Sequence, residues 1–279
     1  MLSASLRRKI RLQESLGRLA FPLVGPVIKF LLVFVGRYRI DNLKEIRTRV
    51  EAVLIESRKN QAPLLLCSNH LTFIDSILLL WAFAPVWRYL VDYERFFWNV
   101  PAADIFAKAP LFKWIGILGK CIFVHRTGSV KHKVEVFETL RYLLSSGRTV
   151  FLFPEGRRSR SGLVEADRLT AGTARLALQV PKCRLFCFYV RSDLQSAYSE
   201  YPPRSSHIHI QMNEIDLAPF RTIPKPKRYL AATASIGATL QVLESRYFHS
   251  HPLAARPVAL ESRKTTSRDV RLAYLSVSR

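Results

Sequence analysis

Short runs of apolar residues alternate along the chain with longer segments in which apolar residues recur at helical spacing. Apolar runs of about four to eight residues are typical of buried strands, and a recurrence at every third or fourth position is typical of amphipathic helices. The short runs, with one alternating segment at the end, predict strands at residues 64–67, 87–91, 121–124, 149–153, 184–190 and 207–212. The spaced pattern predicts helices at residues 42–59, 130–146, 169–180 and 229–248, and one more that ends near residue 83.

This alternation predicts an α/β fold with a central, mostly parallel sheet flanked by helices. The run at residues 64–67 has no polar side chain, as expected for a strand buried on both faces. The alternating segment at 207–212 predicts an edge strand, and residues 96–118, interrupted by Pro101 and Pro110, predict an irregular connection. Ligands of such sheets bind at the carboxyl ends of the strands.

The first forty residues predict a separate membrane-interacting helical segment. Basic residues precede an apolar stretch at residues 19–35, which Pro22, Gly25, Pro26 and Lys29 interrupt. The pattern favours a segment that lies in the membrane interface, with a single span or a core helix as alternatives. We therefore expect an interface segment at residues 1–40, a catalytic domain at 41–250 and a basic, flexible tail at 251–279.

The chain is strongly basic, with 43 Lys and Arg against 21 Asp and Glu and a formal net charge of +22. This charge indicates an anionic partner, either a phospholipid surface, a nucleic acid, or an acidic or phosphorylated substrate. The N-terminal pattern favours an anionic membrane surface, reached from the cytoplasmic side. The four cysteines lack the spacing of a zinc site, so we expect no metal and interpret them as buried thiols in a reducing compartment.

Three polar clusters each follow a predicted strand, and we expect them to meet at one edge of the sheet. The first contains His70 and Asp75, the parts of a general-base pair in which the carboxylate orients the imidazole. A structural histidine, and an aspartate that merely begins a helix, are the plain alternatives.

The second cluster ends in Arg126, whose guanidinium suits a phosphate group. The third contains Glu155 and Gly156, followed by Arg157, Arg158 and Ser159. An exposed arginine and a solvated turn are the alternatives for these two clusters. A carboxylate among arginines instead favours a site that holds an anion and orients a hydroxyl.

These motifs resemble those of the glycerolipid acyltransferase family, of the lysophosphatidic acid acyltransferase type. The first motif matches as Asn69, His70 and Asp75, the second as residues 122–126, and the third as residues 153–159. The resemblance covers residues 62–190. Three positions depart from the family pattern, because Arg157 replaces a small hydroxyl residue, His125 replaces an acid, and Lys120 occupies the place of a glycine.

The resemblance implies direct acyl transfer without a metal or a bound cofactor. His70, assisted by Asp75, would activate the hydroxyl of a lysophospholipid, most simply 1-acyl-sn-glycerol-3-phosphate. That oxygen would attack the thioester of acyl-CoA or of acyl-carrier protein. The implied substrate-binding residues are Asn69, Arg126, Glu155, Gly156, Arg157, Arg158 and Ser159, with both Arg126 and Arg158 on the acceptor phosphate.

Four other interpretations remain. Another lyso-lipid, including a lyso-aminolipid, would serve the same chemistry as acceptor. An acyl-hydrolase would direct the same histidine at water, and an inactive relative would have lost residues that this chain retains. A nucleic-acid-binding protein would explain the charge, but the chain has no zinc-finger spacing, basic zipper or RNA-module signature, so we expect no nucleic acid partner.

Overall fold

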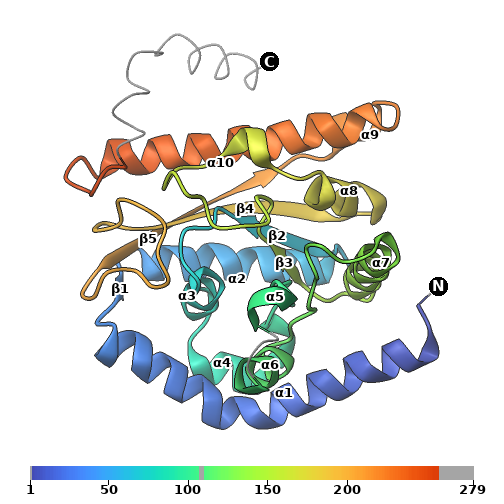
Figure 1. Cartoon of the computed structure of the whole chain (residues 1–279), viewed down its shortest axis with the longest axis horizontal. Helices are drawn as coiled ribbons and strands as arrows, with labels where there is room; N and C mark the ends of the chain where they lie inside the picture. The colour runs from blue at the N-terminus through green and yellow to red at the C-terminus, as the bar shows by residue number, and fades with distance from the viewer. Residues whose placement is uncertain (1, 107–109, 258–279) are drawn as a thin grey trace.

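The computed structural model describes residues 2–106 and 110–257. In this part of the chain five strands form one sheet in the order β1-β5-β4-β2-β3. The strands are β1 (Arg39–Ile40), β2 (Leu64–Ser68), β3 (Val150–Leu152), β4 (Arg184–Ser192) and β5 (His207–Ile215). Helices surround the sheet (Figure 1), so the predicted α/β class is confirmed.

The longer helices are α1 (Ala4–Phe30), α2 (Leu43–Lys59), α3 (Asp75–Phe83), α6 (Pro110–Leu118), α7 (Val130–Ser145), α8 (Gly172–Gln179) and α10 (Lys227–Ser250). Shorter helices are α4 (Val86–Val91), α5 (Ala103–Phe106) and α9 (Ala218–Arg221), and single turns lie at η1 (Leu31–Val35), η2 (Tyr93–Arg95) and η3 (Ala166–Arg168). Most of the predicted helices are therefore present with nearly the predicted bounds.

Strand β2 lies between β3 and β4 and is parallel to both, with Cys67 opposite Leu152 on one side and Cys187 on the other. Strand β4 is antiparallel to β5, which in turn is parallel to β1. The prediction of a mostly parallel sheet is confirmed. The prediction that residues 207–212 form an edge strand is wrong, because the two-residue strand β1, too short to leave a pattern, pairs with the outer side of β5.

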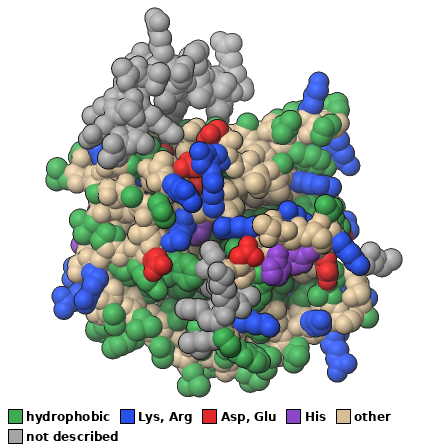
Figure 2. Space-filling model, in the orientation of Figure 1, with side chains coloured by type: hydrophobic (Ala, Val, Ile, Leu, Met, Phe, Trp, Pro, Cys, Tyr) green, Lys and Arg blue, Asp and Glu red, His purple; other side chains and the backbone are tan. Residues whose placement is uncertain are grey.

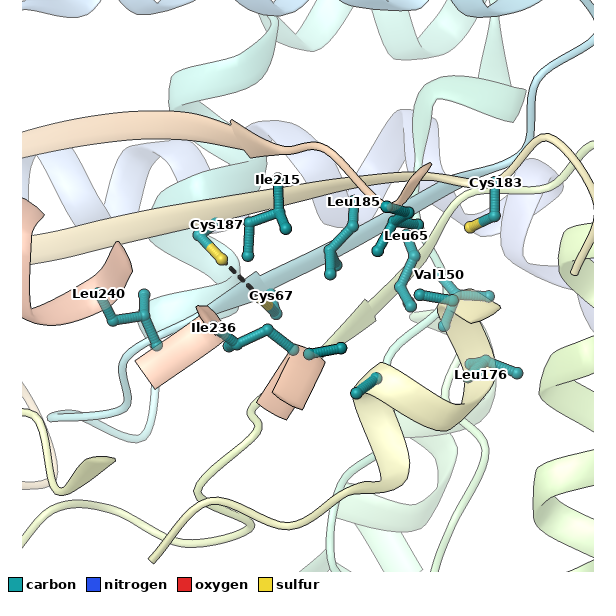
Figure 3. Packing of buried hydrophobic residues seen from close by; sticks show 14 of the residues in the cluster. Leu65, Cys67, Val150, Leu176, Cys183, Leu185, Cys187, Ile215, Ile236 and Leu240 are labelled. Atoms are coloured by element: carbon teal, nitrogen blue, oxygen red, sulfur yellow. Dashed lines mark hydrogen bonds between the residues drawn. The ribbon is translucent and has the colours of Figure 1, made fainter. Parts of the chain in front are cut away.

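Both faces of β2 are buried, as its unbroken apolar run predicted. Leu65 and Cys67 face a cluster formed with α7, α8 and α10, whereas Leu64 and Leu66 face a second cluster formed with α2 and α3. Figure 3 shows the first cluster, where the Cys67 and Cys187 thiols lie 3.4 Å apart near Ile236 and Leu240 of α10. The two clusters hold β2 in the centre of the molecule and so fix the position of its carboxyl end.

Two predicted strands differ from the structure. Residues 87–91 belong to the helix α4, where Tyr89 is buried and its neighbours on both sides are exposed. One buried residue per turn is the pattern of a helix, whereas a strand would bury every second residue. Residues 121–124 are extended and pair with residues 99–102 through isolated parallel bridges, Asn99 to Cys121 and Ala102 to Val124. A third bridge, Trp98 to Val150, joins this pair of segments to β3. The segment predicted as irregular contains α5 and α6, and Pro110 occupies the first position of α6, where proline is favoured.

Helix α1 is continuous through Pro22 and Pro26 and ends in the π-helical turn η1. Both prolines are exposed, and a helix can bend at such a proline and continue. Figure 1 shows α1 along the lower side of the molecule, beneath α4 and α6. Phe21 packs edge-on against Tyr89, Tyr93 and Phe96, at 5.6–5.9 Å between ring centroids. The segment of α1 and η1 is long and apolar enough to cross a membrane, yet one of its sides is packed on the domain.

The chain after α10 returns to the domain as far as it is described. Ala254 is buried, and the Ala255 backbone N–H donates to the Asp193 carbonyl at 2.6 Å. The remainder of the predicted tail, from residue 258 onward, lies outside the described residues.

Candidate active site

The parallel register of β2 and β3 brings the His70 and Glu155 loops together. Cys67 pairs with Leu152, so the two chains leave the sheet side by side at its carboxyl edge. The Ser159 backbone N–H donates to the His70 carbonyl at 2.8 Å, and the His70 ring stacks on Phe153 at 3.7 Å between centroids. Two of the three predicted clusters therefore share one site, and residues about 85 positions apart in sequence are in direct contact.

His70 Nδ1 lies 3.0 Å from Asp75 Oδ2. The same carboxylate oxygen accepts from the backbone N–H groups of Leu71 at 2.7 Å and Thr72 at 2.8 Å, and the Thr72 hydroxyl donates to Oδ1. Only 3% of the Asp75 side chain is exposed, against 16% of that of His70. A carboxylate held in this way accepts the Nδ1 proton, which leaves the lone pair of Nε2 available as a base.

Asn69 is buried, and its side-chain amide pairs with the backbone of Val190 on β4. Its Nδ2 donates to the Val190 carbonyl at 3.0 Å, and its Oδ1 accepts from the Val190 N–H at 2.8 Å. Asn69 thereby ties the end of β2 to the neighbouring strand immediately before His70. Its contacts in this structure are those of a residue that positions the loop.

Glu155 is buried, and neither of its carboxylate oxygens has a hydrogen-bond partner in the described part of the chain. Burial, followed by the negative charge of Glu165, raises the pKa of Glu155 to about 8; the nearby His70 backbone N–H opposes this rise by a smaller amount. At neutral pH the side chain is therefore mostly a neutral acid that can donate its proton in a hydrogen bond. It is an uncommitted polar group beside His70.

Gly156 has a φ of +66°, a conformation that glycine adopts without strain. Its neighbour Arg157 is half exposed and lies 3.8 Å from Glu165, too long for a strong ion pair. Gly156 thus turns the chain back after Glu155, and it leaves the backbone open to a bound molecule because nothing lies within 4 Å of the place a Cβ would take. Arg157 stands at the outer side of this turn.

Arg158 donates from Nη1 to the Ser199 carbonyl at 2.8 Å, and its guanidinium carbon lies 5.7 Å from the centroid of the Tyr198 ring. Ser159 is fully buried; its hydroxyl donates to the Leu163 carbonyl and lies 3.3 Å from Glu165. Arg158 is therefore held against the connection between β4 and β5, while Ser159 holds its own loop from inside.

The contribution of Tyr198 and Ser199 to this site was not predicted from the sequence. They lie in the connection between β4 and β5, which carries no recognisable motif and no regular apolar spacing. No signal in the sequence alone could have placed them beside Arg158.

Arg126 is exposed and makes no hydrogen bond or ion pair with another described residue. It follows the extended segment whose bridges, all parallel, continue the sheet beyond β3, so that segment ends at the same edge as β2 and β3. Its neighbour His125 lies 3.4 Å from Asp104. Arg126 is thus on the predicted side of the sheet, but no described contact joins it to His70 or Glu155.

Lys120, which occupies the place of the family glycine, is buried away from this edge. Its Nζ donates to the carbonyls of Tyr93 and Phe96 at 3.0 and 2.9 Å, and burial lowers its pKa to about 8. Among the described residues, no group of three or more His, Cys, Asp or Glu side chains could hold a metal ion.

The chain is similar to a known protein family and to a known enzyme. Residues 37–191 match the family described as Acyltransferase. An N-acylphosphatidylethanolamine synthase of Arabidopsis thaliana is 33% identical over 128 residues, which are 46% of this chain and 43% of that protein. The match thus spans less than half the length of this relative. The family match covers more than half of the chain and includes all three polar clusters, and we conclude that the chain belongs to the acyltransferase family, with the motifs of the glycerolipid acyltransferases.

Proposed function

We propose that this protein transfers a fatty acyl group from a thioester to the free hydroxyl of a lyso-lipid. The observation that carries this proposal is the His70–Asp75 pair, in which Nδ1 is engaged by a fully hydrogen-bonded carboxylate, whereas Nε2 has no hydrogen-bond partner among the described residues. This arrangement serves general-base catalysis on a hydroxyl. Membership of the acyltransferase family supports the choice of an acyl group as the cargo.

In the proposed reaction His70 Nε2 takes the proton of the acceptor hydroxyl, and the oxygen attacks the thioester carbonyl. The tetrahedral intermediate collapses with loss of the thiolate, which takes the proton back from the imidazolium. Asp75 holds the Nδ1 proton throughout and stabilises the positive ring. The product is an ester and a free thiol, and the donor is acyl-CoA or acyl-carrier protein.

The surrounding residues have different parts in this proposal. Arg126 and Arg158 bind the acceptor phosphate, and Arg157 adds positive charge at the outer side of the site. Glu155 orients the acceptor, and Gly156 lets it approach the backbone. Asn69 and Ser159, whose side chains are engaged inside the protein, act by fixing the His70 loop to β4 and the Glu155 loop to itself, respectively.

The acceptor that we favour is 1-acyl-sn-glycerol-3-phosphate, which would give phosphatidic acid. A second candidate is an aminolipid, because the Arabidopsis relative is named for N-acylation of phosphatidylethanolamine. An amine must lose its proton before it attacks, so the same histidine could serve either acceptor.

We also propose that the protein works on the cytoplasmic surface of an anionic membrane. One stripe of α1 and η1 is exposed and apolar; its members are Leu12, Leu16, Leu19, Leu23, Val27, Phe30, Leu31, Phe34 and Val35. The helices α4 and α6, which pack against α1, also expose apolar side chains, namely Trp87, Leu90, Val91, Trp114 and Ile115. In Figure 2, the side of the molecule that faces the viewer has hydrophobic side chains along its lower part and Lys and Arg side chains across its middle. Glu14 is the only acid among the first forty residues, and Arg148 neutralises it at 2.6 Å.

The proposed function is tested by incubating the purified protein in liposomes with a labelled acyl thioester and a set of acceptors. The set contains lysophosphatidic acid, lysophosphatidylethanolamine, phosphatidylethanolamine and monoacylglycerol, and the products are identified by mass spectrometry. We expect phosphatidic acid as the main product. Release of free fatty acid without any acylated lipid would show a hydrolase and contradict the proposal.

A further inference from the structure

The connection between β4 and β5, residues 193–206, crosses the carboxyl edge of the sheet and contacts the catalytic loop. The Ser199 backbone N–H donates to the Leu71 carbonyl at 3.0 Å, and the Phe73 N–H donates to the Glu200 carbonyl at 2.9 Å. Leu71 is the residue after His70. This connection, which we call the 193–206 loop, therefore forms one wall of the candidate active site.

The 193–206 loop also holds Arg158. The Ser199 carbonyl accepts one N–H of the guanidinium at 2.8 Å, and the Tyr198 ring lies 5.7 Å from its central carbon. A guanidinium has five N–H donors, so one bond to a carbonyl leaves the others available. The ring restricts the guanidinium from one side by a cation–π contact.

The base of the loop is fixed by buried contacts. Arg191, of which 1% is exposed, donates to the carbonyls of Gln195 and Gly162, at 2.6 Å each. Gly162 approaches Ser196 so closely that a Cβ at this position would lie 2.8 Å from the Ser196 carbonyl oxygen. At the other end the Tyr38 hydroxyl donates to the Pro202 carbonyl at 2.8 Å. Because the loop is fixed at both ends, Tyr198 and Ser199 can hold the Arg158 side chain in one orientation.

We propose that Tyr198 and Ser199 are positioning residues that aim Arg158 at an anionic group of the acceptor lipid. The class of ligand is a phosphate monoester or diester, because a planar guanidinium with free N–H groups matches its oxygens. This inference rests on the proposed function, in which Arg158 binds the acceptor phosphate. It adds that the 193–206 loop, outside the recognised motifs, determines how well a phosphate-bearing acceptor is selected.

The test compares Tyr198→Ala, Tyr198→Leu and Tyr198→Phe with Tyr201→Ala, an exposed tyrosine of the same loop with no contact to Arg158. We measure kcat and the KM values of donor and acceptor, using lysophosphatidic acid and the neutral monoacylglycerol. Tyr198→Ala and Tyr198→Leu should raise the KM for lysophosphatidic acid by about two- to five-fold, the size of an exposed cation–π contact. Tyr198→Phe and Tyr201→Ala should leave the KM for lysophosphatidic acid unchanged. All four variants should leave the KM values for monoacylglycerol and for the acyl donor unchanged.

Arg158→Ala and the double variant Arg158→Ala/Tyr198→Ala separate this inference from the proposed function. If Tyr198 acts through Arg158, the double variant should bind acceptor no worse than Arg158→Ala alone. Two outcomes would overturn the positioning role alone. In the first, Tyr198→Ala raises the acceptor KM equally in the wild type and in Arg158→Ala. In the second, the KM is normal for Tyr198→Ala but raised for Arg158→Ala. A normal KM for Arg158→Ala, or a failure to use any phosphate-bearing acceptor, would overturn the phosphate site itself.

Discussion

At the scale of single residues, the proposed mechanism depends on the proton that Asp75 holds on His70. In Asp75→Asn the amide oxygen can take the place of Oδ2, where it still accepts from Leu71, Thr72 and His70 Nδ1, but it carries no negative charge. The imidazolium that forms when Nε2 takes the proton then lacks its charged partner, so His70 becomes a much weaker base. We expect kcat to fall by about 100- to 10,000-fold, the range of general-base catalysis, with the melting temperature little changed.

The control for this variant is Asp41→Asn, which disrupts a second His–Asp contact, Asp41 to His207 at 2.7 Å, on the surface. It should leave kcat unchanged. A normal rate in Asp75→Asn would mean that the carboxylate serves only to begin α3.

Glu155 gives a prediction about pH. Its folded pKa of about 8 lies above its ordinary value of 4.5, so the folded protein holds a proton that the unfolded chain loses. The stability gained from this protonated side chain is complete below pH 4.5 and is lost as the pH rises toward 8. Because one pKa unit corresponds to about 1.4 kcal/mol, the loss is on the order of a few kcal/mol.

Glu155→Gln removes this titration, so its free energy of unfolding should decline less than that of the wild type between pH 5 and 8. Denaturant titrations at several pH values measure this decline, with Glu135→Gln, at an exposed position of α7, as control. Parallel curves for wild type and Glu155→Gln would show that Glu155 is ionised in the folded protein.

The contact between His70 and Asp75 was predictable because both residues lie in one short loop. The partners of Asn69 and Arg158 were not, since Val190 and Ser199 are 121 and 41 positions away and are brought close only by the sheet. Glu155 was predicted as a carboxylate that orients a hydroxyl, but its burial and its raised pKa could not be inferred without the surrounding core.

At the scale of elements, the parallel strands were predictable wherever their apolar runs are buried on both faces, as in β2. The run at residues 87–91 misled because a short apolar segment fits a strand and a helical turn equally well. Tertiary packing decides such a case, and here Tyr89 packs inward with its hydroxyl donating to the Leu80 carbonyl at 2.7 Å. The prolines in α1 misled for another reason, since a helix exposed on one side can bend at a proline and continue.

The two sides of α1 give a prediction about that element. Phe21 faces the domain, whereas Leu23 is 77% exposed. Phe21→Ala should lower the free energy of unfolding by about 1–3 kcal/mol, because it removes a partly buried aromatic ring. Leu23→Ala should leave stability within about 0.5 kcal/mol. Thermal and denaturant unfolding measure both, and equal effects would mean that α1 does not pack as described.

At the scale of the whole molecule, the net charge of +22 and the exposed apolar stripe predict how the protein meets a bilayer. Each basic residue near an anionic surface contributes about 1 kcal/mol, and salt weakens this part. The apolar stripe contributes a part that salt does not remove. Binding should therefore be stronger to anionic than to neutral liposomes, and the difference should shrink in high salt.

The variant Leu19→Ser/Leu23→Ser/Phe34→Ser changes only exposed positions of this stripe. It should bind liposomes of both kinds more weakly while its melting temperature stays the same, and Ile55→Ser, an exposed apolar position on α2, is the control. Undiminished binding by the triple variant would exclude the stripe as the membrane contact. Resistance of the wild type to alkaline carbonate extraction would instead indicate a spanning helix.

The most direct measurement is the rate of acyl transfer to lysophosphatidic acid by purified wild type and His70→Ala, in the same liposomes and with matched melting temperatures. The surface variant His207→Ala serves as the control. We predict a rate at least about 100-fold lower for His70→Ala, since it loses the base, and an unchanged rate for His207→Ala. Transfer by a folded His70→Ala at the wild-type rate would contradict the mechanism.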